Sequence, residues 1–467
     1  MARTSTSEST SRAANSSTPT GRGEAARRRH RPTSCDRHRE LAQRLISRKD
    51  YIMKIEKFSI GIGDRFGKEG VAQLRALEKA EQAGASVVPV WNKSFREHSL
   101  IGTKPDDVRA EADAAVKQLG WRQSYYVDAD HIGMKTVDSF LTASNFYTLD
   151  VADFIGKPPS DETLAGFVRD MAQFRGVLRI PGVDQSFDVT DTVLENIGRQ
   201  YLYAVSEAGR TYRHVAAAKG ADNFVTEVSV DEAMTPQLPF ELFFILGAMA
   251  RERIPAQTIA PKFSGMFLKG IDYVGDIRTF EREFDADLAV VRHAISVFGL
   301  PPSLKISVHT GSDKFSLYPI IRQALRKHGA GLHLKTAGTT WLEEVIGVSL
   351  SGPTGLALAK RIYAQSLARF EELKKPYATV VEIDESKLPK TAEVDSWNAD
   401  VFVRHLRHDQ SVPEYNVHFR QLIHVAFRVA AEMGEEWTSA LDSAREIAGK
   451  CVTENLFDRH LKPLFLG

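Results

Sequence analysis

The chain has 467 residues, of which 43% are hydrophobic and 26% are charged, as is typical of a folded globular protein with a large core. Its formal net charge is +1, with arginines concentrated in the first fifty residues. The two cysteines, Cys35 and Cys451, exclude a disulfide framework and a CxxC metal site, and they favour a reducing, cytoplasmic environment. No apolar run is long enough to predict a membrane span or the centre of a secretory signal.

Residues 1–52 are rich in Ser, Thr, Arg and Gly, and this composition predicts a disordered basic tail. Three interpretations are open: an organellar transit peptide, a nucleic-acid-binding arm, or sequence upstream of a natural start at Met53. We favour the third, because Met53 stands just before the first predicted strand. Nucleic-acid binding is therefore not favoured.

From Met53 onward, strand-like apolar runs alternate with amphipathic helical segments. The eight predicted strands are 58–62, 86–90, 124–127, 146–149, 224–230, 258–262, 305–308 and 331–334. The predicted helical segments include 68–83, 105–119, 315–329 and a long, mainly helical region over 161–218. This alternation predicts an α/β fold, a (β/α)8 TIM-type barrel over 53–385, with a C-terminal helical extension over 386–467 packed on it. An open doubly wound sheet is the alternative.

Polar residues follow the predicted strands, which favours the barrel because catalytic groups of such barrels lie at the carboxyl ends of several strands. Histidines stand at three of these ends: His131, His309 and His333. A lone histidine at a strand end is more often a structural residue. Three that converge at one barrel mouth indicate a site for a divalent metal cation.

Carboxylates follow the third predicted strand (Asp128 and Asp130) and mark the fifth (Glu227, Asp231 and Glu232). In a pocket, one carboxylate can act as a base while a protonated one acts as an acid. Alternation places Glu227 and Asp231 on one face of the strand, which favours a role in the site for Glu227.

Glu232 and two lysines also have structural interpretations. Glu232 is better explained by a helix beginning at Thr235-Pro236. Lys269 and Lys335, which lie near glycines, are candidates for binding an anionic group or are solvated surface lysines.

Several motifs together resemble the tagaturonate epimerase family, whose members interconvert tagaturonate and fructuronate in hexuronate catabolism. The segments that carry the resemblance are Gly63-Asp64-Arg65, Asp128-Ala129-Asp130-His131, Glu227-Val228-Ser229-Val230-Asp231-Glu232, Lys269-Gly270-Ile271-Asp272-Tyr273, His309-Thr310-Gly311-Ser312-Asp313-Lys314-Phe315-Ser316, His333-Leu334-Lys335-Thr336-Ala337-Gly338-Thr339 and Arg420-Gln421-Leu422-Ile423-His424. They span roughly residues 58–430 and occur in the family order.

The resemblance implies a metal-dependent isomerase acting on a sugar acid, with Asp130 as proton acceptor and Glu227 as proton donor. It implies His131 and His309 as ligands of a divalent metal cation, with His333 as the third ligand. The positions implied to contact the substrate are Lys93, Ser94, Lys269 and Asp313, and we add Lys335 as a point charge. Lys93 departs from the family, which has glutamine there, and this bears on which sugar acid is recognised.

The two sugars differ at a carbon that is not adjacent to the ketone, so enolisation alone does not invert it. We therefore expect a retro-aldol route in which Asp130 deprotonates the hydroxyl of the epimerised carbon. A dehydrogenation route would need a nicotinamide, but Gly61-Ile62-Gly63 is followed by Gly67, one residue too late for a dinucleotide fingerprint. The alternatives are a metal-dependent aldolase or sugar isomerase, and, in a different class, a non-catalytic binding protein.

Overall fold

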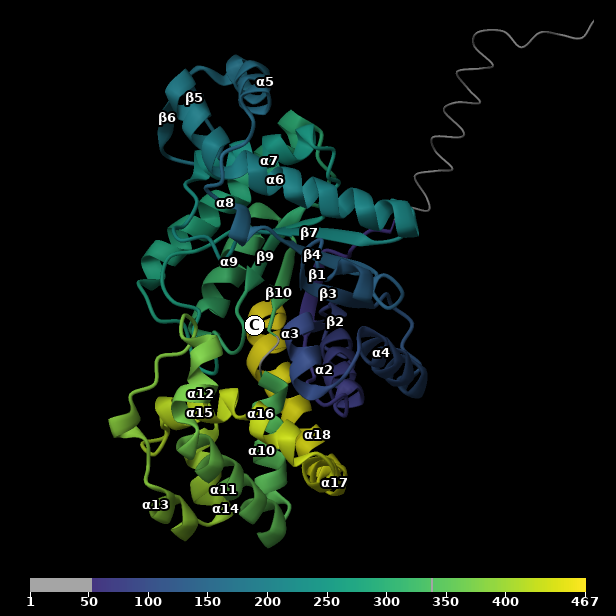
Figure 1. The fold of residues 1–467 in the computed structure, drawn as a ribbon, viewed down its shortest axis with the longest axis vertical. Helices are drawn as coiled ribbons and strands as arrows, with labels where there is room; N and C mark the ends of the chain where they lie inside the picture. Colours follow the sequence, from purple (N-terminus) through teal and green to yellow (C-terminus); the bar gives the residue numbers. More distant parts are fainter. Residues whose placement is uncertain (1–52, 337–338) are drawn as a thin grey trace, which may run out of the picture. The chain divides into compact units, whose positions relative to one another are not determined.

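The computed structural model describes residues 53–336 and 339–467, so the predicted tail over 1–52 lies outside the described residues. Its centre is a closed barrel of parallel strands in the order β1-β10-β9-β8-β7-β4-β3-β2 (Figure 1). The barrel strands are β1 (Phe58–Ile62), β2 (Val88–Ser94), β3 (Tyr126–Ile132), β4 (Phe146–Asp150), β7 (Val225–Ser229), β8 (Thr258–Ala260), β9 (Lys305–His309) and β10 (Leu332–Lys335). The predicted (β/α)8 barrel is confirmed, and the open sheet is excluded because β1 pairs with both β10 and β2.

Two strands run further than the sequence predicts. β2 continues to Ser94 and β3 to Ile132, four and five residues past the predicted ends. Polar residues such as Asn92 and Asp128 resemble turn residues in the sequence. They are paired strand residues whose side chains are buried.

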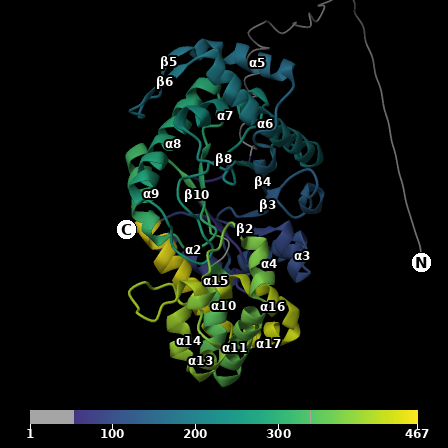
Figure 2. The ribbon, with the colours of Figure 1, turned by 60° about the vertical axis from the view of Figure 1, so that its left-hand side comes forward.

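Helices surround the barrel between successive strands. They are α2 (Gly70–Gln82), α3 (Phe95–Ile101), α4 (Pro105–Leu119), α6 (Asp191–Lys219), α7 (Pro239–Arg251), α8 (Ile277–Phe298) and α9 (Tyr318–His328). The segment η7 (Asn455–Leu466) packs between α9 and α2, where it buries Leu456, Leu461 and Leu464 in the barrel core. The last helical position around the barrel is therefore filled by the end of the described chain (Figure 2).

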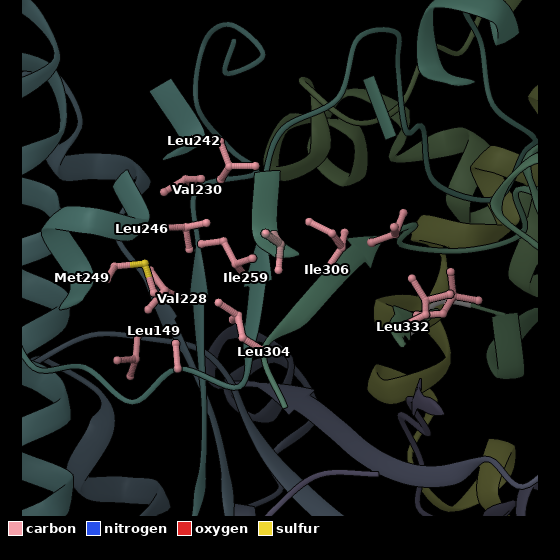
Figure 3. Close-up of a cluster of buried hydrophobic side chains, with 14 of the residues drawn as sticks. Leu149, Val228, Val230, Leu242, Leu246, Met249, Ile259, Leu304, Ile306 and Leu332 are labelled. Atoms are coloured by element: carbon pink, nitrogen blue, oxygen red, sulfur yellow. The ribbon is translucent and has the colours of Figure 1, made fainter. Parts of the chain in front are cut away.

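The outward faces of the strands form an apolar layer with these helices. Figure 3 shows Val228 and Ile259 close to Leu246 of α7, and Ile306 further along on the other side of Ile259. Burial of each such side chain stabilises the fold by about 1.5–3 kcal/mol. Because successive strand residues point to opposite faces, outward Val228 leaves its neighbours Glu227 and Ser229 pointing into the barrel.

An excursion between β4 and β7 carries a small hairpin that the sequence prediction missed. It contains α5 (Asp161–Met171) and the antiparallel strands β5 (Gly176–Arg179) and β6 (Ser186–Val189), inside the region predicted as mainly helical. Each strand has four residues and is partly exposed, so its apolar alternation is too short to reveal it.

A second hydrophobic core follows β10 and draws on residues from Trp341 to Cys451, on both sides of the predicted boundary at 385. Its helices are α10 (Thr339–Leu350), α11 (Pro353–Ala368), α12 (Phe370–Lys374), α13 (Thr391–Ser396), α14 (Ala399–Leu406), α15 (Val417–Val425), α16 (Phe427–Met433), α17 (Glu435–Ser443) and α18 (Arg445–Glu454). They gather in green and yellow beside the barrel (Figures 1 and 2). None of the described helices combines the length and apolarity needed to cross a membrane.

Candidate active site

The inside of the barrel is polar near the carboxyl ends of its strands. The inward side chains there are Asp128, Asp130, Thr148, Glu227, Ser229, His309, His333 and Lys335. Charged groups are stable in such a place only when they are paired and hydrogen-bonded. The ion pairs and hydrogen bonds among these side chains therefore show which of them act together in the site.

Lys335 is the central cation of this interior. Its Nζ lies 2.8 Å from Asp128 Oδ2, 2.7 Å from Asp130 Oδ1 and 3.6 Å from Glu227 Oε1, and it donates to Thr148 Oγ1 at 2.7 Å. Burial lowers the pKa of Lys335, but the three carboxylates outweigh it and raise this pKa above its usual value. Lys335 is thus a buried, charged residue, and the solvated-surface interpretation is wrong.

The carboxylates around Lys335 differ in their proton affinity. Burial raises the pKa of Asp128 to about 6, although Lys335 opposes this. Burial acts in the same direction on Asp130, but Lys335 and His131 lower the pKa of Asp130 below its usual value. Asp130 is therefore ionised at neutral pH.

His309 bridges two carboxylates on and beyond β7. Its Nε2 lies 2.8 Å from Glu227 Oε1 and its Nδ1 lies 3.1 Å from Asp231 Oδ2. Burial lowers the pKa of His309, but Asp231 and Glu227 raise it to about 10. The hydroxyl of Ser229 donates to Asp231 and fixes that carboxylate.

His131 reaches the barrel mouth through a local backbone irregularity. The pairing of β3 with β4 shifts register between Ala129 and Ile132, and His131 has a φ of 52°, in the left-handed region. Such a conformation costs about 1–3 kcal/mol in a residue with a side chain. It brings His131 to the same side as its neighbour Asp130, with Nε2 at 3.8 Å from Asp130 Oδ1, whereas regular alternation would separate them.

His131, Asp231 and His309 together form a group that could hold a metal ion, since one ligand atom from each lies within 4.8 Å of the other two. The His131 and His309 rings are 5.1 Å apart between centroids. Asp150 orients His131, with Oδ2 at 3.3 Å from Nδ1. Two imidazole nitrogens and one carboxylate oxygen suit a borderline divalent cation.

His333, the third predicted ligand, is not part of this group. It stands two residues before Lys335 and pairs in register with Ser307, one layer below His309. There it is fully buried, with Nδ1 at 2.9 Å from Ser59 Oγ, and burial lowers its pKa to about 3. The structure places Asp231, and not His333, beside the two other histidines.

The loop that begins at Asp231 lines the barrel mouth, because the next helix begins later than predicted. α7 begins at Pro239 and not at Thr235-Pro236. A cavity of about 430 Å³ lies here, within the range of small-molecule sites. Its polar lining comprises His131, Asp231, Glu232, Lys262, Lys269, His309 and Thr379.

Lys269 supplies a cation to this cavity. Its backbone N–H donates to Val380 of the helical region at 2.8 Å, which ties the loop to the segment lining the cavity. Its ammonium has no hydrogen-bond or ion-pair partner among residues 53–336 and 339–467. Burial lowers the pKa of Lys269, as does the charge of Arg65.

The side chains of the other residues predicted to contact the substrate make hydrogen bonds to other protein groups. Lys93 Nζ donates to the carbonyl of Arg65 at 3.0 Å, and Ser94 Oγ accepts the Glu97 backbone N–H as the N-cap of α3. Asp313 is fully buried. Its carboxylate is bound by Arg420 at 2.7 Å, Thr339 at 2.8 Å, His408 at 3.0 Å and His460 at 3.2 Å.

The sequence prediction gives no role to Thr148, Asp150 or Arg65, although Asp150 and Arg65 closely follow predicted strands. The Thr148 hydroxyl lies within hydrogen-bonding distance of Glu227 Oε1 and Asp128 Oδ2, either of which can accept its one proton, and it accepts from Lys335. Its position between outward-facing Tyr147 and Leu149 is the signal that could have found it, because alternation turns Thr148 inward.

Comparison with known proteins agrees with this architecture. The family model for tagaturonate epimerase (UxaE) matches residues 24–441. The tagaturonate/fructuronate epimerase of Thermotoga maritima is 29% identical over 430 residues, which are 86% of this chain and 80% of that protein.

Crystal structures of fructuronate-tagaturonate epimerase UxaE from Cohnella laeviribosi share the fold. The complexes with one and with two glycerols superpose with TM-scores of 0.71 and 0.72 at 23% identity, covering 90% of this chain and 85% of theirs. The native form has a TM-score of 0.59. Since the family model matches most of the chain, this protein belongs to the tagaturonate epimerase family and is an isomerase of the epimerase type.

Proposed function

We propose that this enzyme interconverts tagaturonate and fructuronate by a metal-dependent retro-aldol route in the cytoplasm. The observation that carries the proposal is the pair Asp130 and Glu227, both within ion-pair distance of Lys335 and next to the His131, Asp231 and His309 group. The relatives named above carry this activity in their names, and the cavity at the mouth is of a size for a six-carbon sugar acid.

His131, Asp231 and His309 are the residues that would hold a divalent cation. They fit it in donor type and in the mutual distance of their ligand atoms, provided that His309, whose two ring nitrogens both contact carboxylates, gives up one ring proton to the cation. Surrounding carboxylates such as Asp150 and Glu227 favour positive charge. When bound, such a cation supplies Lewis-acid stabilisation of an oxyanion that develops on the substrate.

Asp130 is the base of the proposed reaction. Its ion pair with Lys335 keeps it ionised, so that it can accept the proton from the hydroxyl of the epimerised carbon. The bond from that carbon toward the ketone then breaks, which leaves an enediolate and an aldehyde. Rotation of the aldehyde before the bond re-forms presents its other face, where Glu227 donates a proton to the new hydroxyl oxygen. Asp130 keeps the proton that it accepted, so the two carboxyl groups exchange roles in the reverse direction.

Glu227 is the proton donor of the proposed reaction and protonates the hydroxyl oxygen that forms on the other face of the aldehyde. Its Oε1 is bound by His309 and Thr148, while Oε2 is buried without a partner in the described part of the chain. Oε2 is therefore the atom at which we place the transferred proton. Lys335 lies within ion-pair distance of both Glu227 and Asp130 and supplies the compensating charge for both.

Lys269 is the direct substrate contact that the cavity supports best. Contacts of the substrate with Lys93, Ser94 and Asp313 stay predictions. The bonds of Lys93 to the Arg65 carbonyl and of Asp313 to Arg420 fit a role in positioning the walls of the site.

Asp130→Asn tests the assignment of the base. General-base catalysis contributes about 10²–10⁴-fold, so we expect kcat with fructuronate to fall by about that factor. Asp138→Asn is the matched control, because Asp138 is 75% exposed and paired with surface His214. Near-normal turnover by Asp130→Asn would remove Asp130 from the mechanism.

The rival reaction is an aldolase on the same site, since a retro-aldol site that releases its aldehyde is an aldolase. Product analysis separates the two. An epimer alone supports the proposal, and free three-carbon products identify an aldolase.

A further inference from the structure

A group of buried polar atoms without partners lies around the loop that carries Lys269. They are Arg65 Nη1, Tyr377 OH, Gln421 Oε1 and both ring nitrogens of His424. None of them has a hydrogen-bond partner among the described residues. Buried polar atoms nearly always have partners, so this concentration indicates a place for a polar ligand.

Helix α15 brings two of these residues to the Lys269 loop. Gln421 Nε2 donates to the carbonyl of Lys269 at 3.1 Å. His424 packs against the next residue, since a Cβ at Gly270 would lie 3.3 Å from the His424 Cβ. Gly270 has a φ of 82°, and its lack of a side chain permits this close approach.

Arg65 and Tyr377 both pack near the ring of Phe427, the first residue of α16. The Arg65 guanidinium lies 4.2 Å from the Phe427 centroid, and the Tyr377 ring lies 6.4 Å from it. Arg96 in turn stacks over Tyr377 at 5.0 Å. The barrel loop after β1, helix α3 and the helical region therefore all contribute to one locus.

The charge of this locus is positive. Arg65 is 5% exposed, and its Nε pairs with Glu97 Oε1 at 3.2 Å, which leaves Nη1 without a partner. Burial, together with the charges of Arg65 and Lys269, lowers the pKa of His424 well below its usual value, so this ring is neutral and can donate one N–H. Lys269 and Arg96 add two further cations.

We propose that Arg65, Lys269 and His424 form the subsite for the carboxylate of the substrate, an inference that rests on the proposed function. Tyr377 adds a hydroxyl donor to the same oxygens, and the Gln421 carbonyl accepts from a neighbouring sugar hydroxyl. Arg65 Nη1 donates a charge-assisted hydrogen bond to the carboxylate, and the donors of Lys269, His424 and Tyr377 complete its coordination.

The subsite has a consequence for the reaction. Lys269 also lines the cavity with His131 and His309, and its Nζ lies beside Gly311, two residues after His309. Anchoring one end of the sugar acid here sets the reacting carbon at the barrel mouth. The helical region is therefore part of substrate recognition, through α15 and Tyr377.

Direct binding tests the subsite without turnover. Galactonate, an open-chain six-carbon acid, and galactitol, its neutral counterpart, are titrated into the full-length protein by calorimetry. We expect galactonate to bind at least about 10-fold more tightly than galactitol, because a charge-assisted hydrogen bond is worth about that factor or more.

Arg65→Met and Lys269→Met should each weaken galactonate binding by about 10–100-fold and leave galactitol binding within about twofold. Arg428→Met is the matched control, since Arg428 follows Phe427 but is 34% exposed and pairs with Glu372 and Glu432. It should bind galactonate like the wild type. Circular dichroism verifies folding, and two substitutions on different loops keep the test valid if one does not fold.

Equal binding of the two ligands by the wild type, or full galactonate affinity in Arg65→Met, would overturn the subsite. Failure of the proposed function is separate from this. A protein that prefers galactonate through Arg65 yet does not epimerise ketohexuronates retains the subsite and loses the proposed reaction.

Discussion

Lys335→Met is expected to destabilise the protein strongly, because it removes the cation shared by three buried carboxylates. Asp128 and Asp130 lie 2.8 and 2.7 Å from Nζ, and Glu227 lies 3.6 Å away. At an effective dielectric constant of about 20, each of the two close pairs has a Coulomb energy of about 6 kcal/mol. The cost of desolvating the ions offsets much of that.

Loss of one partner of a buried pair costs about 3–5 kcal/mol, and we expect Lys335→Met to fall in this range. The assay is equilibrium unfolding in urea at pH 7, followed by tryptophan fluorescence, with reversibility verified by refolding. The double variant Lys335→Met/Asp128→Asn should recover at least about 1 kcal/mol, because it removes one of the carboxylates left without compensation. A loss below about 1 kcal/mol, or a double variant less stable than the single one, would refute this view of the barrel interior.

Three further predictions concern other parts of the molecule. Burial and the neighbouring Asp64 raise the pKa of Glu69 to about 8, so between pH 4.5 and 8 the folded protein keeps this carboxyl protonated while the unfolded chain ionises it, and the resulting loss of stability grows with pH. Glu69→Gln should therefore raise the unfolding free energy by about 2–4 kcal/mol at pH 8 and by little at pH 4, and equal effects at both pH values would contradict this assignment. His131→Ala should weaken Mn²⁺ binding at least about 10-fold in calorimetry, whereas His333→Asn should not, and the reverse order would restore His333 as the ligand. Asp313→Asn leaves Arg420 buried without its carboxylate and should lower the unfolding free energy by about 3–5 kcal/mol, and a stability close to wild type would show that Asp313 is not the anchor of that cluster.

The barrel strands were predictable because each contains an apolar run with alternating faces, unlike the short hairpin strands β5 and β6. The prediction of Glu227 and Asp231 on one face follows from the same alternation, and His309 contacts both. The sequence does not show at which layer along the barrel axis an inward side chain lies. His309 and His333 look alike there, but the register pairs His309 with Lys335 and leaves His333 one layer lower.

Other features depend on contacts that local sequence does not encode. Regular alternation would turn His131 away from Asp130, and the bulge in β3 reverses this. Asp313 has the local appearance of a residue at the barrel mouth. Its partners Arg420 and His460 lie 107 and 147 residues further along the chain, so its burial appears only when the helical region packs on the barrel.

The most direct test of the central claim is the conversion of fructuronate by the purified protein, followed by NMR. The protein is treated with a chelator, and a divalent cation is then restored. We expect the chelated protein to be inactive and the restored protein to form tagaturonate without three-carbon products. Epimerisation that survives full metal removal would contradict the metal-dependent route, and release of three-carbon products or absence of any epimer would contradict the proposed function itself.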